Sequence, residues 1–149
     1  MAEICEGTER YQRFHREREE RSDYRFVDEA IAKSAIDAAN RLKAKAIAAF
    51  TESGATTMWM SRIGTEIPIY AFSRNASTHR RVCLYRGVYP VAYHPEARDH
   101  IGVNREVVQQ LRQLGAVEDG DLVVLTKGDL AGVPGGTNTL KIIQVGVDA

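Results

Sequence analysis

The chain has 149 residues, enough for one compact domain with a hydrophobic core and too few for two domains of ordinary size. Lys and Arg together number 20, as do Asp and Glu, so net charge gives no reason to expect nucleic acid or a membrane surface as a partner. No apolar stretch approaches the roughly 20 residues that span a bilayer, and neither the two cysteines nor the four histidines have metal-ligand spacing, so we expect a cytoplasmic protein without a metal site.

Residues 1–25 differ in composition from the rest of the chain. A short, partly apolar start is followed by a dense run of mixed charge at residues 15–23, which could not enter a core at a tolerable free-energy cost. We therefore predict a helical arm and a charged linker over residues 1–25, and a folded domain over residues 26–149.

Residues 26–43 are predicted to form a helix. Their apolar positions recur at helical spacing: Val27, Ile31, Ala35, Ala38 and Leu42. Asp28 and Glu29 would lie in the first turn, where the helix dipole favours negative charge. We expect the apolar face to pack on a sheet, while the many alanines allow a close approach to another helix, in the core or across a subunit contact.

Five apolar runs are predicted to form strands: residues 46–50, 67–72, 89–93, 122–126 and 140–145. Helices are predicted over residues 55–63, 76–85 and 103–114, the last with Asn104 as its N-cap and Gly115 as its terminator. This alternation is typical of a mostly parallel sheet with helices on both faces, which places the protein in the α/β class.

The connection at residues 127–139 is the exception to this alternation. It is rich in glycine and too irregular for a helix, so the last two strands should be antiparallel neighbours. Lys141 and Gln144 interrupt the last strand, which we therefore expect at an edge of the sheet.

A hydroxyl-rich loop lies between the first strand and the next helix, and it consists of Thr51, Glu52, Ser53, Gly54, Ala55, Thr56 and Thr57. Helix-start N–H groups lack intrahelical partners and carry partial positive charge. With the Thr and Ser hydroxyls of the loop pointing toward the same small volume, they would suit a phosphate. A Ser or Thr before a helix is also an ordinary N-cap, so this second interpretation stays open.

Six segments occur in an order and spacing that match a known family: Met1–Cys5, Thr51–Gly54, Ile67–Ile69, Leu84–Val91, Gly120–Val124 and Gly136–Thr139. With them the chain resembles the C-terminal domain of pyruvate kinase over nearly its whole length. The resemblance implies a three-layer α/β/α sandwich around a five-stranded mixed sheet of order 3-2-1-4-5, with strand 5 antiparallel.

The family's catalysis takes place elsewhere in the enzyme. Phosphoenolpyruvate, ADP, Mg²⁺ and K⁺ bind in a (β/α)₈ barrel of about 250 residues, which this chain is too short to form. The resemblance therefore implies the regulatory end of a pyruvate kinase, with the tail of the barrel at residues 1–25 and with no catalytic residue, metal or cofactor of its own.

The family's loops after strands 1 and 4 bind an activating phosphorylated effector. Carried over to this chain, the resemblance implies that Thr51, Ser53, Gly54, Ala55 and Thr56 hold the phosphate, and we add Thr57 on its chemistry alone. A glycine-rich segment would fold over the sugar: Gly132, Val133, Pro134, Gly135, Gly136 and Thr137. A plain flexible hairpin is the alternative for this segment.

Three residues bear on the choice of effector. Glu52 and Ala55 stand where members that respond to bisphosphates often have Lys or Arg, and Arg74 would supply charge to the same edge or else be a solvated arginine. A carboxylate at Glu52 would repel a second phosphate unless it points away. We therefore expect ribose 5-phosphate, glucose 6-phosphate or AMP rather than fructose 1,6-bisphosphate, with loss of regulation as an open alternative.

The resemblance also implies assembly. In the family, the helix at residues 26–43 and the edge strand at residues 140–145 meet their symmetry mates, which would make the protein a homo-oligomer. The alternative is a stand-alone α/β module that binds a phosphate ligand and has no enzymatic partner.

Overall fold

Five strands form one mixed sheet in the order β3-β2-β1-β4-β5. The computed structural model of the chain describes residues 3–5, 7–8, 23–96, 99–129 and 135–147. Its elements are α2 (Val27–Leu42), β1 (Ala46–Phe50), α3 (Ala55–Ile63), β2 (Ile69–Ser73), α4 (Ala76–Val82), β3 (Val88–Ala92), α5 (His100–Gln113), β4 (Leu122–Lys127) and β5 (Thr139–Gln144). None of the described helices is long and apolar enough to cross a membrane.

The strand order and directions are those predicted. β1 pairs in parallel with β2 and β4, β2 pairs in parallel with β3, and β5 is antiparallel to β4 at one edge. β1 is apolar throughout, and β4 is apolar from Leu122 to Leu125, because both faces of these central strands are covered. The sheet order therefore reverses at β1, and the loops that follow β1 and β4 emerge at the same edge.

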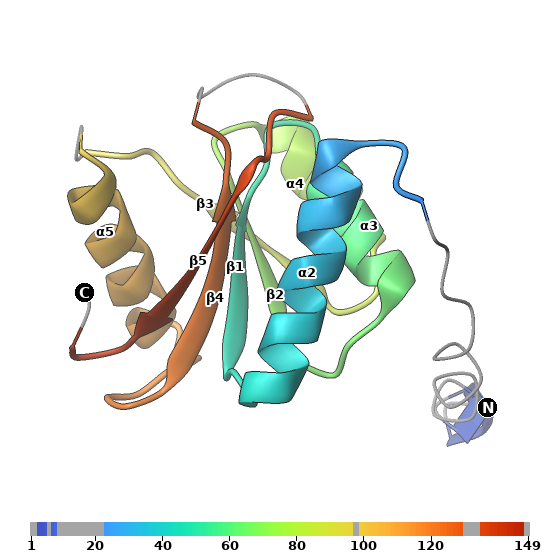
Figure 1. Cartoon of the computed structure of the whole chain (residues 1–149), viewed down its shortest axis with the longest axis horizontal. Helices are drawn as coiled ribbons and strands as arrows, with labels where there is room; N and C mark the ends of the chain where they lie inside the picture. Colours follow the sequence, from blue (N-terminus) through green and yellow to red (C-terminus); the bar gives the residue numbers. More distant parts are fainter. Residues whose placement is uncertain (1–2, 6, 9–22, 97–98, 130–134, 148–149) are drawn as a thin grey trace.

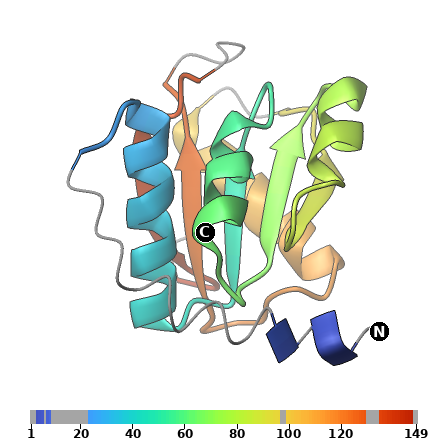
Figure 2. The ribbon, with the colours of Figure 1, turned by 90° about the vertical axis from the view of Figure 1, so that its right-hand side faces the viewer.

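The helices form two layers, one on each face of the sheet. Figure 1 shows the sheet nearly edge-on, with α5 on one side and α2, α3 and α4 on the other, and Figure 2 shows these three helices from the front. One core cluster joins the sheet to Ala35 of α2, Met60 of α3 and Val82 of α4. The other joins it to Val107 and Leu111 of α5. The result is the predicted three-layer α/β/α sandwich.

The buried face of α2 differs from the prediction. Val27 and Leu42 are exposed by 63% and 44%. The buried residues are instead Asp28, Ala32, Ala35, Ile36 and Ala39. Small alanine side chains let the helix lie close to the sheet and to α3, so the alanine stripe is buried and the bulkier aliphatic residues at the two ends face outward.

Two other helices have ends that differ from the prediction. α4 stops at Val82 instead of residue 85, because Leu84 and Tyr85 donate to carbonyls only three residues back. α5 begins at His100 instead of residue 103, and its N-cap is Asp99, not Asn104. Of the predicted arm at residues 1–25, the described residues 3–5 and 7–8 are helical, and most of the rest lies outside the described residues.

Candidate functional site

The loop between β1 and α3 is a tight turn closed by its own hydroxyls. The Gly54 N–H donates to Thr51 Oγ1 at 2.8 Å, and Thr57 Oγ1 donates to the Gly54 carbonyl at 2.9 Å. Gly54 has φ +87°, and a Cβ there would lie 3.2 Å from a methyl carbon of Val82. Glycine is therefore required at this position by both its backbone conformation and its neighbour.

The sequence predicts that the hydroxyls of this loop converge on one volume, but two of them close the turn instead. Those of Thr51 and Thr57 are engaged with Gly54. Thr56 points away from the turn, and Ser53 makes no side-chain hydrogen bond to the described residues. Helix α3 starts without a side-chain cap, so its first N–H groups keep their capacity to donate.

The second predicted segment meets this loop directly. Thr56 Oγ1 and Thr137 Oγ1 lie 2.7 Å apart and share a hydrogen bond, although 81 residues separate them in the chain. Both side chains are buried, with 2% and 6% exposure. The structure thus joins the start of α3 to the connection between β4 and β5 at one corner of the sheet.

The β4–β5 connection has a fixed base. Gly128 and Gly136 approach so closely that a Cβ on Gly128 would lie 2.5 Å from the Gly136 carbonyl oxygen. Asp129 and Asn138 exchange hydrogen bonds, and Thr139 donates to both. Gly135, Gly136 and Thr137 are described, whereas the predicted site residues Gly132, Val133 and Pro134 lie outside the described residues.

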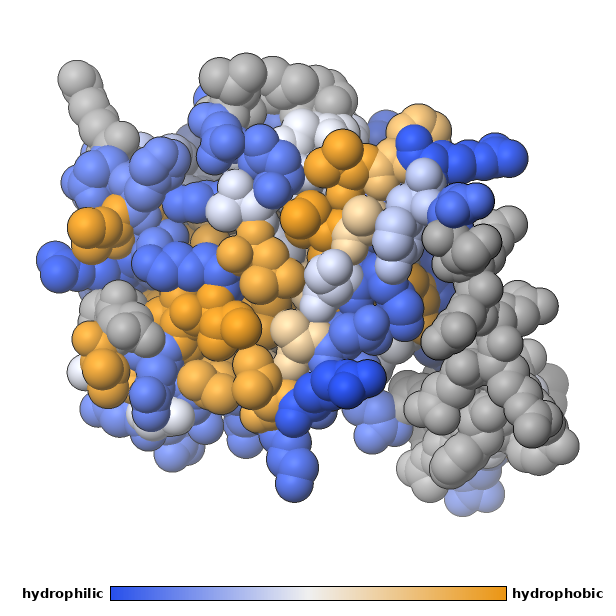
Figure 3. Space-filling view, in the orientation of Figure 1, coloured by the Kyte–Doolittle hydropathy of each residue, from blue (hydrophilic) through white to orange (hydrophobic). Residues whose placement is uncertain are grey.

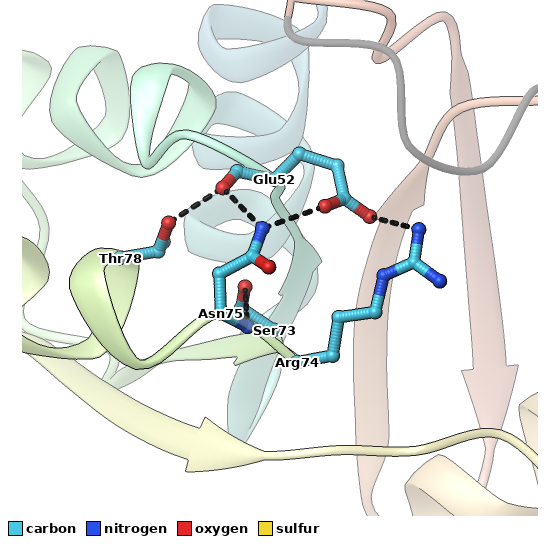
Figure 4. A network of polar contacts seen from close by, with 5 residues as sticks. All are labelled: Glu52, Ser73, Arg74, Asn75 and Thr78. Atoms are coloured by element: carbon cyan, nitrogen blue, oxygen red, sulfur yellow. Dashed lines mark hydrogen bonds and ion pairs between the residues drawn. The ribbon is translucent and has the colours of Figure 1, made fainter.

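Glu52 is turned toward the segment that follows β2. Figure 4 shows Arg74, Asn75 and Thr78 reaching it. Asn75 Nδ2 donates to Glu52 Oε2 at 2.8 Å, and Thr78 Oγ1 donates to the Glu52 carbonyl at 2.5 Å. An Arg74 nitrogen lies 3.5 Å from Glu52 Oε1. The carboxylate is therefore compensated, and Arg74 is held beside the loop by an ion pair.

Arg81 is a second cation at this loop, and the sequence analysis missed it. Its Nη1 donates to the Ser53 carbonyl at 2.8 Å from the last turn of α4. The two residues are 28 positions apart, so the contact is not evident in the sequence. Only the packing of α4 against Gly54 brings the guanidinium there.

A buried polar corner extends the site toward α2. It consists of Asp28, Thr56, Thr126 and Thr137, whose exposed fractions are 6%, 2%, 0% and 6%. Asp28 Oδ1 accepts from the Glu29 N–H at 3.0 Å. Asp28 Oδ2 lies 4.0 Å from where a Cβ of Gly135 would be. Asp28 is not among the site residues predicted from the sequence, where its carboxylate is expected only to interact with the helix dipole. The signal for its burial is its spacing to Ala32, Ala35 and Ala39.

The described residues contain no group of three or more His, Cys, Asp or Glu side chains placed to hold a metal ion. What the corner offers is N–H and O–H donors, two neighbouring arginines and one buried carboxylate. Such a set can hold an anion at the start of α3 and accept hydrogen bonds from hydroxyl groups beside it.

Comparison with known proteins gives a consistent family. Residues 29–143 match the family model described as "Pyruvate kinase, alpha/beta domain". Pyruvate kinase II of Salmonella typhimurium is 43% identical over 148 residues, which cover 97% of this chain and 30% of that protein. A pyruvate kinase of Buchnera aphidicola (subsp. Acyrthosiphon pisum) is 39% identical over 97% of the chain, and pyruvate kinase 2 of Saccharomyces cerevisiae is 37% identical over 79%. The chain spans about 30% of the length of the bacterial relatives.

Proposed function

The chain belongs to the pyruvate kinase family, whose alpha/beta domain it carries, and from this we propose that it is the regulatory and subunit-assembly domain of a cytoplasmic, glycolytic pyruvate kinase. The whole enzyme would convert phosphoenolpyruvate and ADP to pyruvate and ATP in a catalytic barrel that also binds Mg²⁺ and K⁺. This domain would bind a phosphorylated effector. The contact between Thr56 and Thr137 carries the proposal, because it joins the two loops that leave β1 and β4 where the strand order reverses.

The phosphate would bind at the start of α3. The uncapped N–H groups of this helix point toward that end, and an anion there interacts favourably with the helix dipole. The Ser53 hydroxyl, which has no hydrogen bond to the described residues, would add a donor that brings no charge to be desolvated, and the Thr56 hydroxyl would hold the second loop beside the phosphate through Thr137. In this proposal, residues 51–57 hold the phosphate and residues 132–137 lie over the sugar.

The effector would be a monophosphate such as ribose 5-phosphate, glucose 6-phosphate or AMP. A second phosphate needs a cation of its own, and Ala55 offers none. The guanidinium of Arg74 is already paired with Glu52. These residues support a single phosphate group and disfavour fructose 1,6-bisphosphate.

Assembly would use the outer faces of α2 and β5. Figure 3 shows apolar side chains over much of this side of the molecule, along β4 and β5 and beside α2. Val27 and Leu42 of α2 and Ile142 of β5 are exposed by 63%, 44% and 40%. β5 is also an edge strand with unpaired backbone groups, which favours pairing with a second copy. Because Thr137 lies two residues before β5, an effector bound at Thr56 and Thr137 would act on this surface directly.

Calorimetric titration of the chain with ribose 5-phosphate, glucose 6-phosphate, AMP and fructose 1,6-bisphosphate tests the proposal. We expect heat from at least one monophosphate and weaker binding of the bisphosphate. Ala55→Glu, which places a carboxylate in the first turn of α3, should abolish binding. Gln109→Glu adds the same charge on exposed α5, across the sheet, and should leave binding unchanged. Absence of heat with all four ligands would remove the sensor role.

A further inference from the structure

Among the Asp, Glu, Lys, Arg and His residues that the structure describes, Asp28 is the one that is buried. A carboxylate removed from water is costly unless hydrogen bonds or cations compensate it. Oδ1 accepts from the Glu29 N–H at 3.0 Å. Oδ2 faces the backbone of Gly135, because a Cβ there would lie 4.0 Å away. This carboxylate would repel a bound phosphate, so it cannot contribute to the proposed phosphate site.

A second buried group lies at the same end of the fold. The Thr126 hydroxyl is fully buried and has no hydrogen-bond partner among the described residues. Thr126 pairs with Ala49 in the sheet and faces the layer of α2 and α3, as Ala49 and Val124 do. Buried hydroxyls are almost always hydrogen-bonded, so an orphan of this kind points to a missing partner.

The topology places Asp28 and Thr126 together. α2 runs antiparallel to β1, which it enters through the short turn at residues 43–45, so the first turn of α2 lies at the carboxyl end of the parallel strands. Figure 1 shows the start of α2 at the same end as the β4–β5 connection. Thr126 is the last but one residue of β4 at that end. Asp28 and Thr126 therefore border the corner that Thr56 and Thr137 close.

We propose that Asp28 and Thr126 form a hydroxyl-binding subsite that selects sugar monophosphates and excludes a second phosphate; this rests on the proposed function, in which residues 51–57 hold the first phosphate. An ionised carboxylate only accepts hydrogen bonds, so it binds a sugar hydroxyl and repels a phosphate. The Thr126 hydroxyl can donate to the same sugar or accept from it. A ligand hydroxyl that donates to Asp28 Oδ2 at this corner could also give the Thr126 hydroxyl the partner that the described residues do not supply.

With this subsite, Asp28 and not Glu52 accounts for the preference for a monophosphate effector. From sequence, Glu52 is the carboxylate expected to repel a second phosphate. The Glu52 carboxylate is bound by Asn75 and lies 3.5 Å from an Arg74 nitrogen, so its charge is already compensated. No cation of the described residues lies within ion-pair distance of Asp28, which makes Asp28 the effective carboxylate at this corner.

The test compares Asp28→Asn with Glu29→Gln in calorimetric titrations of the chain. Both changes remove one negative charge from the first turn of α2, but the Glu29 carboxylate accepts from the Arg25 N–H, away from Gly135. The ligands are inorganic phosphate, ribose 5-phosphate and fructose 1,6-bisphosphate. For Asp28→Asn we expect ribose 5-phosphate to bind about tenfold more weakly, from loss of a charged acceptor, and the bisphosphate about tenfold more tightly, from loss of repulsion.

Glu29→Gln should leave the ratio of the two sugar phosphates unchanged, and inorganic phosphate should bind both variants about as well as the parent chain. If Asp28→Asn does not fold, Asp28→Ser keeps an acceptor for the Glu29 N–H and has the same expected result. If the affinities for the two sugar phosphates change in the same direction in a folded Asp28 variant, or do not change, the subsite proposal is refuted. The proposed phosphate site is unaffected by that result. A parent chain that binds none of the ligands would overturn the proposed function itself.

Discussion

The hydrogen bond between Thr56 and Thr137 should couple the β1–α3 loop to the β4–β5 connection in solution. Both side chains are buried and their oxygens lie 2.7 Å apart. Valine has nearly the shape of threonine, so Thr→Val removes the hydroxyl with little change in packing. Each single variant leaves the other hydroxyl buried without its partner, which should cost about 1–3 kcal/mol of unfolding free energy.

The double variant Thr56→Val/Thr137→Val separates this bond from the two individual hydroxyls. Replacing both partners by apolar groups of the same shape is nearly neutral. We therefore expect the double variant to be at least as stable as either single variant, with a coupling free energy of about 1–2 kcal/mol. Urea unfolding followed by circular dichroism gives these values, provided that all four proteins unfold with the same m-value.

Ser53→Ala is the control within the same loop. The Ser53 hydroxyl makes no hydrogen bond to the described residues, so its removal should change the unfolding free energy by less than about 0.5 kcal/mol. If the effects of the two valine substitutions simply add, to within about 0.5 kcal/mol, the two loops are not coupled through this bond. The regulatory proposal would then lose its main structural support.

Three further predictions concern the loop, the second helical layer and the assembly surface. Gly54→Ala should destabilise the chain more than Gly120→Ala in urea unfolding, because both glycines have positive φ but only Gly54 has a neighbour in the way. The Gly102 N–H bonded to Asp99 lowers the pKa of this carboxyl, so Asp99→Ala should lower the melting temperature at neutral pH, and the difference from the parent should vanish as pH falls through the lowered pKa; a difference that persists at pH 2 would refute the cap. Ile142→Lys should reduce the mass measured by light scattering to that of one chain at tens of micromolar, whereas Leu84→Lys, at an exposed residue beyond α4, should not; equal masses for parent and Ile142→Lys would remove β5 from the interface.

The sheet could be predicted from sequence because its strands are continuous apolar runs. β1 and β4 are buried on both faces, so β1 is apolar throughout and β4 is apolar from Leu122 to Leu125. The glycine-rich composition of residues 127–139, which is unfavourable for a crossover helix, was enough to predict that β5 is antiparallel to β4. Local composition therefore determines both the order of elements and the direction of the last pairing.

The inner face of α2 could not be chosen from periodicity alone. Two stripes of this helix are apolar, one with Val27 and Leu42 and the other with Ala32, Ala35 and Ala39. Side-chain size favours the first stripe, whereas the close packing of α2 on β4 and α3 favours the second. The choice depends on the distance between the layers, which sequence does not reveal.

The site likewise has features that local sequence predicts and features that depend on contacts between segments far apart in the chain. The position of the loop at residues 51–57 and the need for Gly54 are local features, and both can be expected from an apolar run followed by a hydroxylated turn. The contact of Arg81 with Ser53 and the position of Asp28 near Gly135 each involve separate elements. They follow only from how α2 and α4 pack against the two loops.

The parallel pairing of β1 with β4 also bears on how the chain folds. Ala46 pairs with Val123, so this ladder closes a segment that contains α3, β2, α4, β3 and α5, whereas β4 and β5 are joined by one short connection. Closing so long a segment costs chain entropy before any contact rewards it, which makes this step slow. The corner at Thr56 and Thr137 depends on that ladder, so any molecule bound there would stabilise the whole chain against unfolding, by a free energy that grows with the logarithm of its concentration over its dissociation constant.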